Sequence, residues 1–250
     1  MQFSDFITEQ KNTHMTHIED KVLYGGVKGT RDAILALRSL RDMLGGEHEG
    51  KVSVKWDGAP AVFCGTDPRD GEFFVAKKGI FAKSPKVYKS NADIDADTSG
   101  DLNTKLKLAL KHLPELGIKG IIQGDFLYSK SDIKNQKIKG KNYVTFHPNT
   151  IVYAVPRESD AATAIKQSKI GIVWHTTYKG NSFETLKASY GVDVSRFNST
   201  RNVWSQDATL RDLTKLTMSR KDTDEVTNYL STAGQIFNQI SGTTLRTLEK

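Results

Sequence analysis

The chain has 250 residues, of which 37% are hydrophobic and 26% are charged, close to the balance of an ordinary globular protein. This length suits one large domain, or one domain with a small appendage, and the composition argues against wholesale disorder. Lysine and arginine outnumber aspartate and glutamate by 36 to 29, and such a surplus attracts nucleic acids or nucleoside triphosphates. Solubility alone would explain the surplus equally well.

Features that the sequence lacks disfavour several classes of protein. No stretch approaches the roughly 20 apolar residues of a membrane span, and the first residues do not form a signal peptide. The single cysteine, Cys64, cannot form an internal disulfide and lacks partners for a cysteine-based zinc site. Walker-type and Gly-x-Ser-x-Gly motifs are absent. We therefore expect a cytoplasmic protein with no membrane partner.

The amino-terminal part of the chain predicts helices. Apolar residues between His17 and Leu44 recur at helical spacing. Gly25-Gly26 and Gly29 interrupt them, so we expect a short helix, a turn and a longer helix. Gly45-Gly46 is expected to end the second helix.

From Lys51 the period of the apolar residues changes to two, which predicts an antiparallel β-meander. Its first strand ends at Lys55, and Ala61 to Cys64 forms the second. A turn rich in glycine and aspartate then leads to the third strand, Glu72 to Ala76. The polar and acidic residues 91–101 are interpreted as a surface loop.

Further strands and helices follow in the second half of the chain. Expected helices are 102–113, 160–166, 183–190, 207–218 and 222–248, and expected strands are 121–128, 143–146, 151–155 and 170–174. The fold class is therefore α+β. We expect one domain over residues 1–200 and a helical carboxyl-terminal segment over 201–250, which is either a subdomain or the start of a region that this chain does not complete.

The segment from Lys51 to Gly79 carries the strongest chemical signal. Lys55 and Asp57 lie two residues apart at a strand end, so their side chains point to the same face. Gly58 then allows a tight turn and a close approach of a ligand to the backbone. A lysine amine can attack the α-phosphate of a nucleoside triphosphate once it has lost its proton, and its ordinary pKa is about 10.4.

Lys55-Trp56-Asp57-Gly58 resembles the Lys-x-Asp-Gly nucleophile motif of the covalent nucleotidyltransferases, which include ATP-dependent DNA ligases, RNA ligases and mRNA capping enzymes. The order of segments along the chain also resembles that of uncharacterised ligase-like proteins of tailed bacteriophages. The resemblance implies the ligase-type fold of antiparallel sheets with flanking helices. It implies that Lys55 is the nucleophile, that ATP or GTP and Mg²⁺ are cofactors, and that the partners are RNA or DNA ends. For a phage protein, the compartment would be the host cytoplasm.

Later segments extend the resemblance. Asp125 follows Gly124 on a strand that resembles the family's Gly-Glu-Leu strand, so Asp57 and Asp125 are the expected carboxylates for ribose and metal. Trp174 occupies the place of an aromatic residue that stacks on the purine. The implied nucleotide-binding set is completed by Gly58, Lys77 and Lys78. His175 either reaches a phosphate or packs in the core.

The sequence also departs from the family pattern. Pro60 stands where DNA ligases have arginine, which favours RNA ligases. The family's later Glu-Gly and Lys-x-Lys strands are not found in residues 1–250. The sequence therefore leaves two readings: a polynucleotide ligase-like enzyme, or a non-catalytic nucleic-acid-binding or phage structural protein on the same fold. Lysines gather in two segments, 77–89 and 130–141, which either reading can use.

Overall fold

The computed structural model describes residues 17–46, 53–212 and 217–248. Contacts between residues divide the chain into two compact units. The helical unit combines Met1–Val54 with Arg211–Lys250, and the sheet unit is Lys55–Leu210. None of the helices within the described ranges is long and apolar enough to span a bilayer. The fold is a mixture of helices and mainly antiparallel sheets, as the sequence predicts.

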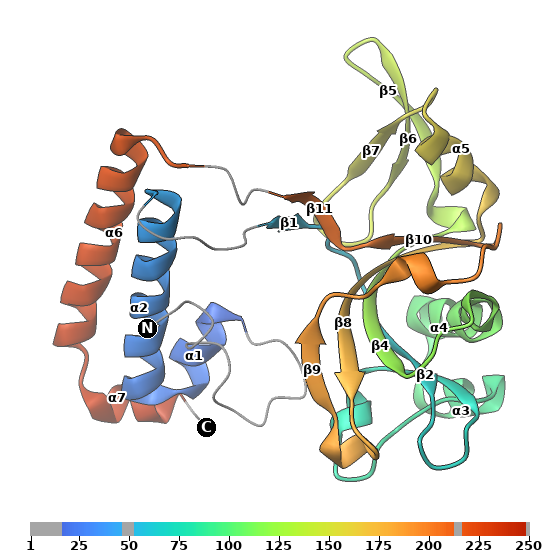
Figure 1. Cartoon of the computed structure of the whole chain (residues 1–250), viewed down its shortest axis with the longest axis horizontal. Helices are drawn as coiled ribbons and strands as arrows, with labels where there is room; N and C mark the ends of the chain where they lie inside the picture. The colour runs from blue at the N-terminus through green and yellow to red at the C-terminus, as the bar shows by residue number, and fades with distance from the viewer. Residues whose placement is uncertain (1–16, 47–52, 213–216, 249–250) are drawn as a thin grey trace. The chain divides into compact units, whose positions relative to one another are not determined.

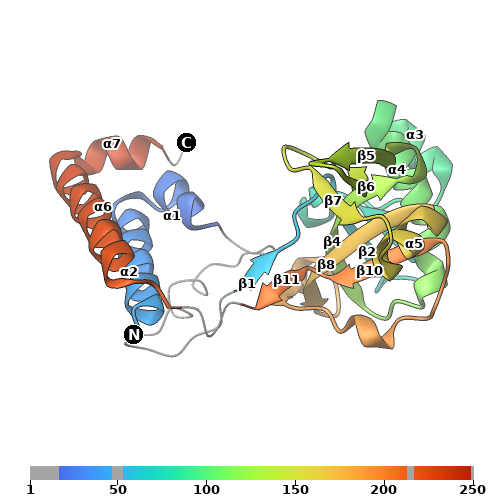
Figure 2. The ribbon, with the colours of Figure 1, turned by 90° about the horizontal axis from the view of Figure 1, so that it is seen from above.

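The helical unit consists of helices from both ends of the chain. Their bounds are α1 (Ile18–Tyr24), α2 (Gly26–Leu44), α6 (Arg220–Gln239) and α7 (Gly242–Thr247). Helix α2 packs against α1, α6 and α7, and Figures 1 and 2 both show α2 beside α6. A Cβ on Gly29 would lie 2.1 Å from the carbonyl oxygen of Lys21, so only glycine permits the close packing of α1 on α2.

The division into units differs from the expected boundary at residue 200. The carboxyl-terminal helices do not stand alone, because α6 and α7 pack on the amino-terminal α2. An amphipathic helix must bury its apolar stripe against another element, and here the partner comes from the other end of the chain. Residues just after 200 belong to the sheet unit, since β10 (Val203–Asp207) pairs with β8 (Ile170–Lys179).

The larger sheet of the sheet unit has six strands in the order β10-β8-β4-β2-β3, with β9 paired to β8. Its remaining strands are β2 (Ala61–Thr66), β3 (Phe73–Ala76), β4 (Ile121–Ser129) and β9 (Lys187–Tyr190). All these pairs are antiparallel except β10 with β8. The register places Ala61 opposite Asp125 and Gly124 opposite Trp174.

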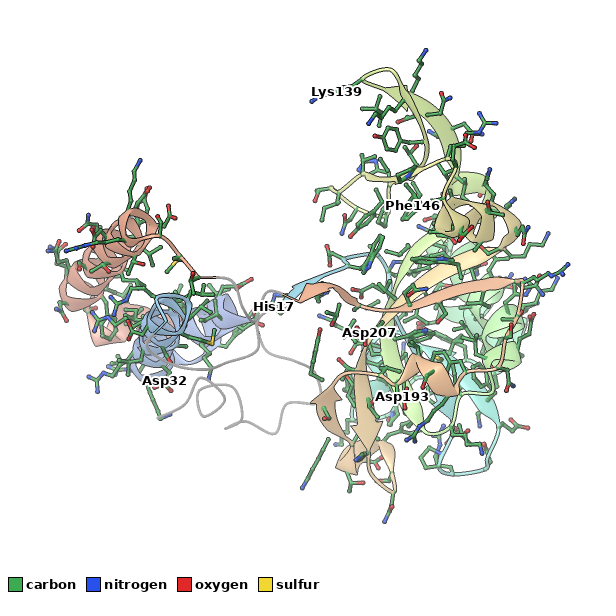
Figure 3. The ribbon with its side chains drawn as sticks, turned by 45° about the horizontal axis from the view of Figure 1, so that its top comes forward. His17, Asp32, Lys139, Phe146, Asp193 and Asp207 are labelled. Carbon is green, nitrogen blue, oxygen red and sulfur yellow. The ribbon has the colours of Figure 1, made fainter. Side chains whose placement is uncertain are left out.

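A second sheet has three strands, β5 (Lys134–Ile138), β6 (Lys141–Phe146) and β7 (Tyr153–Pro156). Figure 3 shows Lys139 at the tip of the β5–β6 hairpin and Phe146 at the end of β6. A two-stranded sheet of β1 (Ser53–Lys55) and β11 (Thr209–Asp212) lies where the chain enters and leaves the sheet unit. The helices of this unit are α3 (Asn91–Asp97), α4 (Gly100–His112) and α5 (Asp160–Gln167).

Strand β4 is buried along all nine residues, because other elements cover both of its faces. On one face, Ile122 and Phe126 join a core that includes Leu106 of α4. On the other face, Leu127 and Tyr128 pack with residues of the second sheet and of α5. Any polar side chain of β4 is therefore held firmly and largely shielded from water.

Three sequence predictions are wrong, each for a local reason. Residues 91–101 contain α3 and the start of α4 instead of a loop, because a capping box of Ser90 and Asp93 starts the helix and Ile94 anchors it in the core. Residues 183–190 form a 3-10 turn and β9, and residues 209–212 form β11 instead of a helix. In the last two cases strand pairing outweighs weak helical patterns.

Asp67, in the turn between β2 and β3, is a fully buried carboxylate. Its Oδ2 atom lies 2.7 Å from Arg69 Nη2 and 2.9 Å from Lys89 Nζ. Burial alone would raise the pKa of Asp67, but hydrogen bonds from Arg69 and Lys89 hold it well below its ordinary value. The charged carboxylate therefore stabilises the fold at neutral pH.

We expect Asp67→Asn to lower the free energy of unfolding by about 2–3 kcal/mol, because two cations lose their buried partner. Urea denaturation at pH 7 measures this loss. Since the folded pKa is depressed, the carboxylate's contribution is complete above about pH 4, the unfolded value, and disappears as the pH falls below it. The variant should therefore lose less stability than the wild type on acidification. Asp70→Asn, which changes an exposed partner of Lys89, should cost less stability than Asp67→Asn.

Candidate active site

Lys55 lies at the end of β1, between two carboxylates. Its Nζ atom is 3.4 Å from Asp125 Oδ2 and 3.7 Å from Asp57 Oδ1. The side chain of Asp125 is 9% exposed and that of Lys55 is 42% exposed, so a nearly buried anion meets an amine that solvent can reach. Asp57 and Asp125, which are 68 positions apart in sequence, thus meet at one amine.

The segment between β1 and β2 brings Lys55 and Asp57 close to Asp125. Residues 58–60 continue β2 along β4, with Ala59 N donating to Phe126 O at 3.0 Å and Phe126 N donating to Pro60 O at 3.0 Å. A Cβ on Gly58 would lie 2.6 Å from Phe126 O and 3.1 Å from the Cβ of Asp125. Glycine is therefore required at position 58 by the close approach of two backbones, and this approach brings the motif against Asp125.

Gly58→Ala should lower the free energy of unfolding by about 1–3 kcal/mol, because the new methyl group displaces backbone that β4 holds in place. Thermal or urea unfolding measures the effect. Gly79→Ala is the matched control, since a Cβ there meets only the side chain of Lys86, at 3.5 Å or more. Equal losses in both variants would contradict the role of close packing at Gly58.

Asp57 is held in place by Tyr153 of β7 and by Asn149 in the loop between β6 and β7. The Tyr153 hydroxyl accepts from Asp57 N at 2.8 Å and donates to Asp57 O at 2.9 Å. Burial raises the pKa of Tyr153, so its hydroxyl stays protonated and able to donate. Asn149 Nδ2 donates to Asp57 Oδ2 at 2.5 Å. No sequence motif marked Asn149 or Tyr153, because they reach the site only through the fold.

His175 completes the surroundings of Asp125. Its Nε2 atom lies 3.4 Å from Asp125 Oδ1, and its Nδ1 atom is 2.7 Å from Thr176 Oγ1. The two oxygens of Asp125 thus face Lys55 and His175 separately. The sequence left His175 either reaching a phosphate or packing in the core. In the structure its side chain is 11% exposed and contacts the Asp125 carboxylate.

Three residues of the implied nucleotide-binding set make no ion pair or side-chain hydrogen bond with Lys55, Asp57 or Asp125 in the part of the chain that the structure describes. Trp174 is fully buried, donates from Nε1 to Ser205 Oγ at 2.6 Å and packs on Phe197, so its ring has no face free for a purine. Lys77 pairs with Asp97 of α3 at 2.9 Å, and Lys78 is exposed. The base-stacking prediction for Trp174 is therefore wrong: its ring packs over Gly124, where a Cβ would lie 2.7 Å from the indole.

The carboxylates of Asp57 and Asp125 are the candidate metal ligands. Within the described ranges, no group of three or more histidine, cysteine, aspartate or glutamate side chains forms a preformed metal site. Two carboxylates are the donor set with which proteins usually hold Mg²⁺, whose remaining ligands are waters and substrate phosphates. The residues present fit that mode and no fully protein-bound metal.

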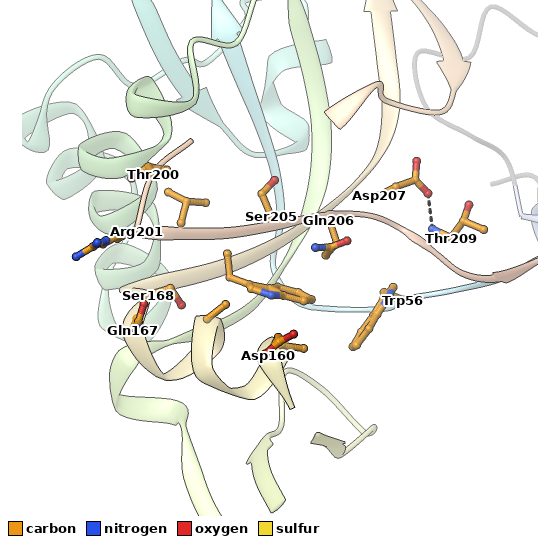
Figure 4. Close-up of a pocket in the computed structure, with 14 residues that line it drawn as sticks. Trp56, Asp160, Gln167, Ser168, Thr200, Arg201, Ser205, Gln206, Asp207 and Thr209 are labelled. Carbon is orange, nitrogen blue, oxygen red and sulfur yellow. Dashed lines mark hydrogen bonds between the residues drawn. The ribbon is translucent and has the colours of Figure 1, made fainter. Parts of the chain in front are cut away.

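A cavity of about 730 Å³ lies beside the site, between α5 and β10 (Figure 4). It is lined by Trp56, Asp160, Ala161, Ala164, Gln167, Ser168, Thr200, Arg201, Val203, Trp204, Ser205, Gln206, Asp207 and Thr209. Neither Lys55 nor Asp125 lines this cavity, although Trp56 is the residue between Lys55 and Asp57. This cavity is therefore not a cleft shared by Lys55 and Asp125.

Comparisons with known proteins identify a family without assigning an activity. Curated proteins give no match to this chain, and solved structures give none either. One family model matches residues 12–250, nearly the whole chain, and its description is "Family of unknown function (DUF6267)". On this match, the chain belongs to the DUF6267 family.

Proposed function

We propose that the protein is a nucleotidyltransferase of the ligase-like kind, which forms a covalent lysyl-nucleotide from ATP or GTP and passes it to a nucleic-acid end. The observation that carries the proposal is the position of Lys55 Nζ, 3.4 Å from the nearly buried Asp125 and 3.7 Å from Asp57. A lysine beside two carboxylates supplies the groups this chemistry needs, and the motif resemblance supports the same assignment.

In the first step, the neutral amine of Lys55 attacks the α-phosphorus. A nitrogen–phosphorus bond forms, the bond from the α-phosphorus to the bridging oxygen breaks, and pyrophosphate leaves with the electron pair of that bond. Asp125 Oδ2, 3.4 Å from Nζ, is the nearest carboxylate oxygen that can accept the ammonium proton. In the second step, an oxygen of the nucleic-acid end attacks the same phosphorus, and the Lys55 amine leaves.

The two carboxylates also place negative charge beside the Lys55 amine, at 3.4 Å and 3.7 Å. When bound, Mg²⁺ would be held by Asp57 and Asp125 and would neutralise charge on the carboxylates and the phosphates. Tyr153 and Asn149 keep Asp57 in place, so its oxygen needs little rearrangement when substrate arrives.

A non-catalytic nucleic-acid-binding protein is the second candidate, and the hairpin of the second sheet favours it. All residues of β5 are exposed, and the lysines of the β5–β6 hairpin have no acidic partner within ion-pair distance among the described residues. These lysines are Lys134, Lys137, Lys139 and Lys141. Lysine on an edge strand also discourages aggregation, so the hairpin alone does not decide between the two functions.

The test incubates the whole protein with α-³²P-labelled ATP or GTP and Mg²⁺, followed by denaturing gel electrophoresis. We expect label that stays on the protein, that requires Mg²⁺ and that is released by added pyrophosphate. No label from any of the four ribonucleoside triphosphates would remove the enzymatic proposal and leave the nucleic-acid-binding one.

A further inference from the structure

The cavity between α5 and β10 has an aromatic wall. The rings of Trp56 and Trp204 meet edge to face, with centroids 5.8 Å apart. Trp204 is 9% exposed, and Trp56 is held from behind by Tyr153 at a centroid distance of 4.6 Å. Two indoles that are fixed by packing and reach a cavity form a surface on which a flat ring can stack.

The strand geometry separates this wall from the nucleophile. Successive side chains of an extended segment point to opposite sides. Lys55 and Asp57 therefore lie together on one side, and Trp56 points the other way into the cavity. Residues 55–57 therefore place Lys55 and Asp57 at the candidate active site and Trp56 in the cavity. The cavity is thus separate from the proposed site of the triphosphate.

The polar side chains that line the cavity include two carboxylates, Asp160 and Asp207, of which Asp207 accepts from Thr209 N at 2.7 Å. The others include serines with partners and side chains without them. Ser168 and Ser205 are bonded within the protein, to Tyr128 at 2.9 Å and to Trp174 at 2.6 Å. Gln167, Gln206 and Arg201 also line the cavity, and their side chains have no hydrogen-bond partner within the described parts of the chain (Figure 4). An amide and a guanidinium present the donors and acceptors that the edge of a nucleobase requires.

Basic residues neighbour the carboxyl end of α5, which lines one end of the cavity. Lys166 and Lys169 flank the lining residues Gln167 and Ser168 in the sequence, and Arg201 is itself a lining residue. Lys130 Nζ donates to the main-chain carbonyl of Lys166, and Lys130 N donates to Lys169 O at 2.8 Å, so Lys130 lies against the same segment. Over residues 17–46, 53–212 and 217–248, no carboxylate lies within 4 Å of the charged atoms of these four side chains.

We propose that this cavity holds a base of single-stranded nucleic acid on Trp56 and Trp204, while Lys130, Lys166, Lys169 and Arg201 contact the neighbouring phosphates. Stacking surfaces beside a cationic rim are the two components of single-strand binding. Duplex DNA does not fit, because its paired bases do not offer a ring face to the indoles. The inference deepens the proposed function, since it names where the nucleic-acid substrate is held, and it is tested without nucleoside triphosphate.

The test measures binding of a fluorescein-labelled 12-nucleotide oligonucleotide to the whole protein, by anisotropy, without nucleoside triphosphate. The triple variant K166Q/K169Q/R201Q should bind about 10–100-fold more weakly at 50 mM salt. The slope of log affinity against log salt should become shallower by about 2, at roughly 0.7 per phosphate contact. The control K111Q/K119Q/K187Q removes the same charge from exposed positions elsewhere in the sheet unit and should change the affinity less than about 3-fold.

Base stacking is tested separately by tryptophan fluorescence. The single-stranded oligonucleotide should quench the emission, an abasic chain of equal length should not, and the quenching should fall in Trp56→Phe or Trp204→Phe. Equal weakening by the two triple variants, equal affinity for duplex and single strand, or quenching by the abasic chain would each overturn the proposal. The K166Q/K169Q/R201Q variant should still form the lysyl-nucleotide, so failure of strand binding is distinct from failure of the proposed enzyme activity.

Discussion

Lys55→Arg should abolish the covalent labelling of the protein by α-³²P-labelled nucleotide, with a loss of at least about 10⁴-fold in the rate of label formation. Arginine keeps the positive charge between Asp57 and Asp125, but its guanidinium does not lose a proton near neutral pH and is no nucleophile. Removal of a covalent nucleophile costs losses of this size in other enzymes. Because the charge is kept, the fold and its melting temperature should change little.

The control for this variant is Lys119→Arg, an exposed lysine of the same unit, which should label at the wild-type rate. The bond itself supplies a second readout: a phosphoramide is cleaved by acid and survives alkali, whereas an acyl phosphate shows weaker resistance to alkali. Wild-type labelling that persists in Lys55→Arg, or label with the stability of an acyl phosphate, would move the nucleophile to another residue and disprove the proposed role of Lys55.

Asp125→Asn should lower the rate of label formation by about 10²–10³-fold without abolishing it. The substitution keeps the shape of the side chain but removes the nearest proton acceptor of Lys55 and one of the two candidate Mg²⁺ ligands. A general base typically contributes about 10²–10⁴-fold. The rate should be measured between pH 6 and 9, because the loss should shrink as the pH rises and hydroxide takes over removal of the proton.

Two controls separate chemistry from folding in this second variant. Asp101→Asn alters an exposed carboxylate that pairs with Lys105 on α4, and it should label normally. The melting temperature of Asp125→Asn shows whether the loss of the carboxylate contacts with Lys55 and His175 disturbs the sheet. A wild-type labelling rate in a folded Asp125→Asn protein would show that Asp125 has no part in the reaction, and the contact with Lys55 would then be structural.

Local sequence determined the elements whose signals lie within a few residues. The alternation that ends at Lys55, the turn after β2 and the strand at β4 were all predicted and are confirmed. So were the short helix α1, the longer helix α2 and most of α6 and α7, although Gly29, which was expected to interrupt the segment, lies within α2. In each case the signal is a period or a chain break, which depends on backbone geometry alone. The motif also named Lys55, Asp57 and Asp125, which the fold brings together.

Tertiary structure decided what depends on partners distant in sequence. Strand β5 has no apolar alternation of its own and forms because β6 pairs with it. Asn149 and Tyr153 reach Asp57 from a sheet that no motif links to Lys55. Trp174 looked suited to a ligand, yet its place opposite Gly124 directs the ring into the core. Whether a side chain faces a ligand or the interior is fixed by strand register, which local sequence does not encode.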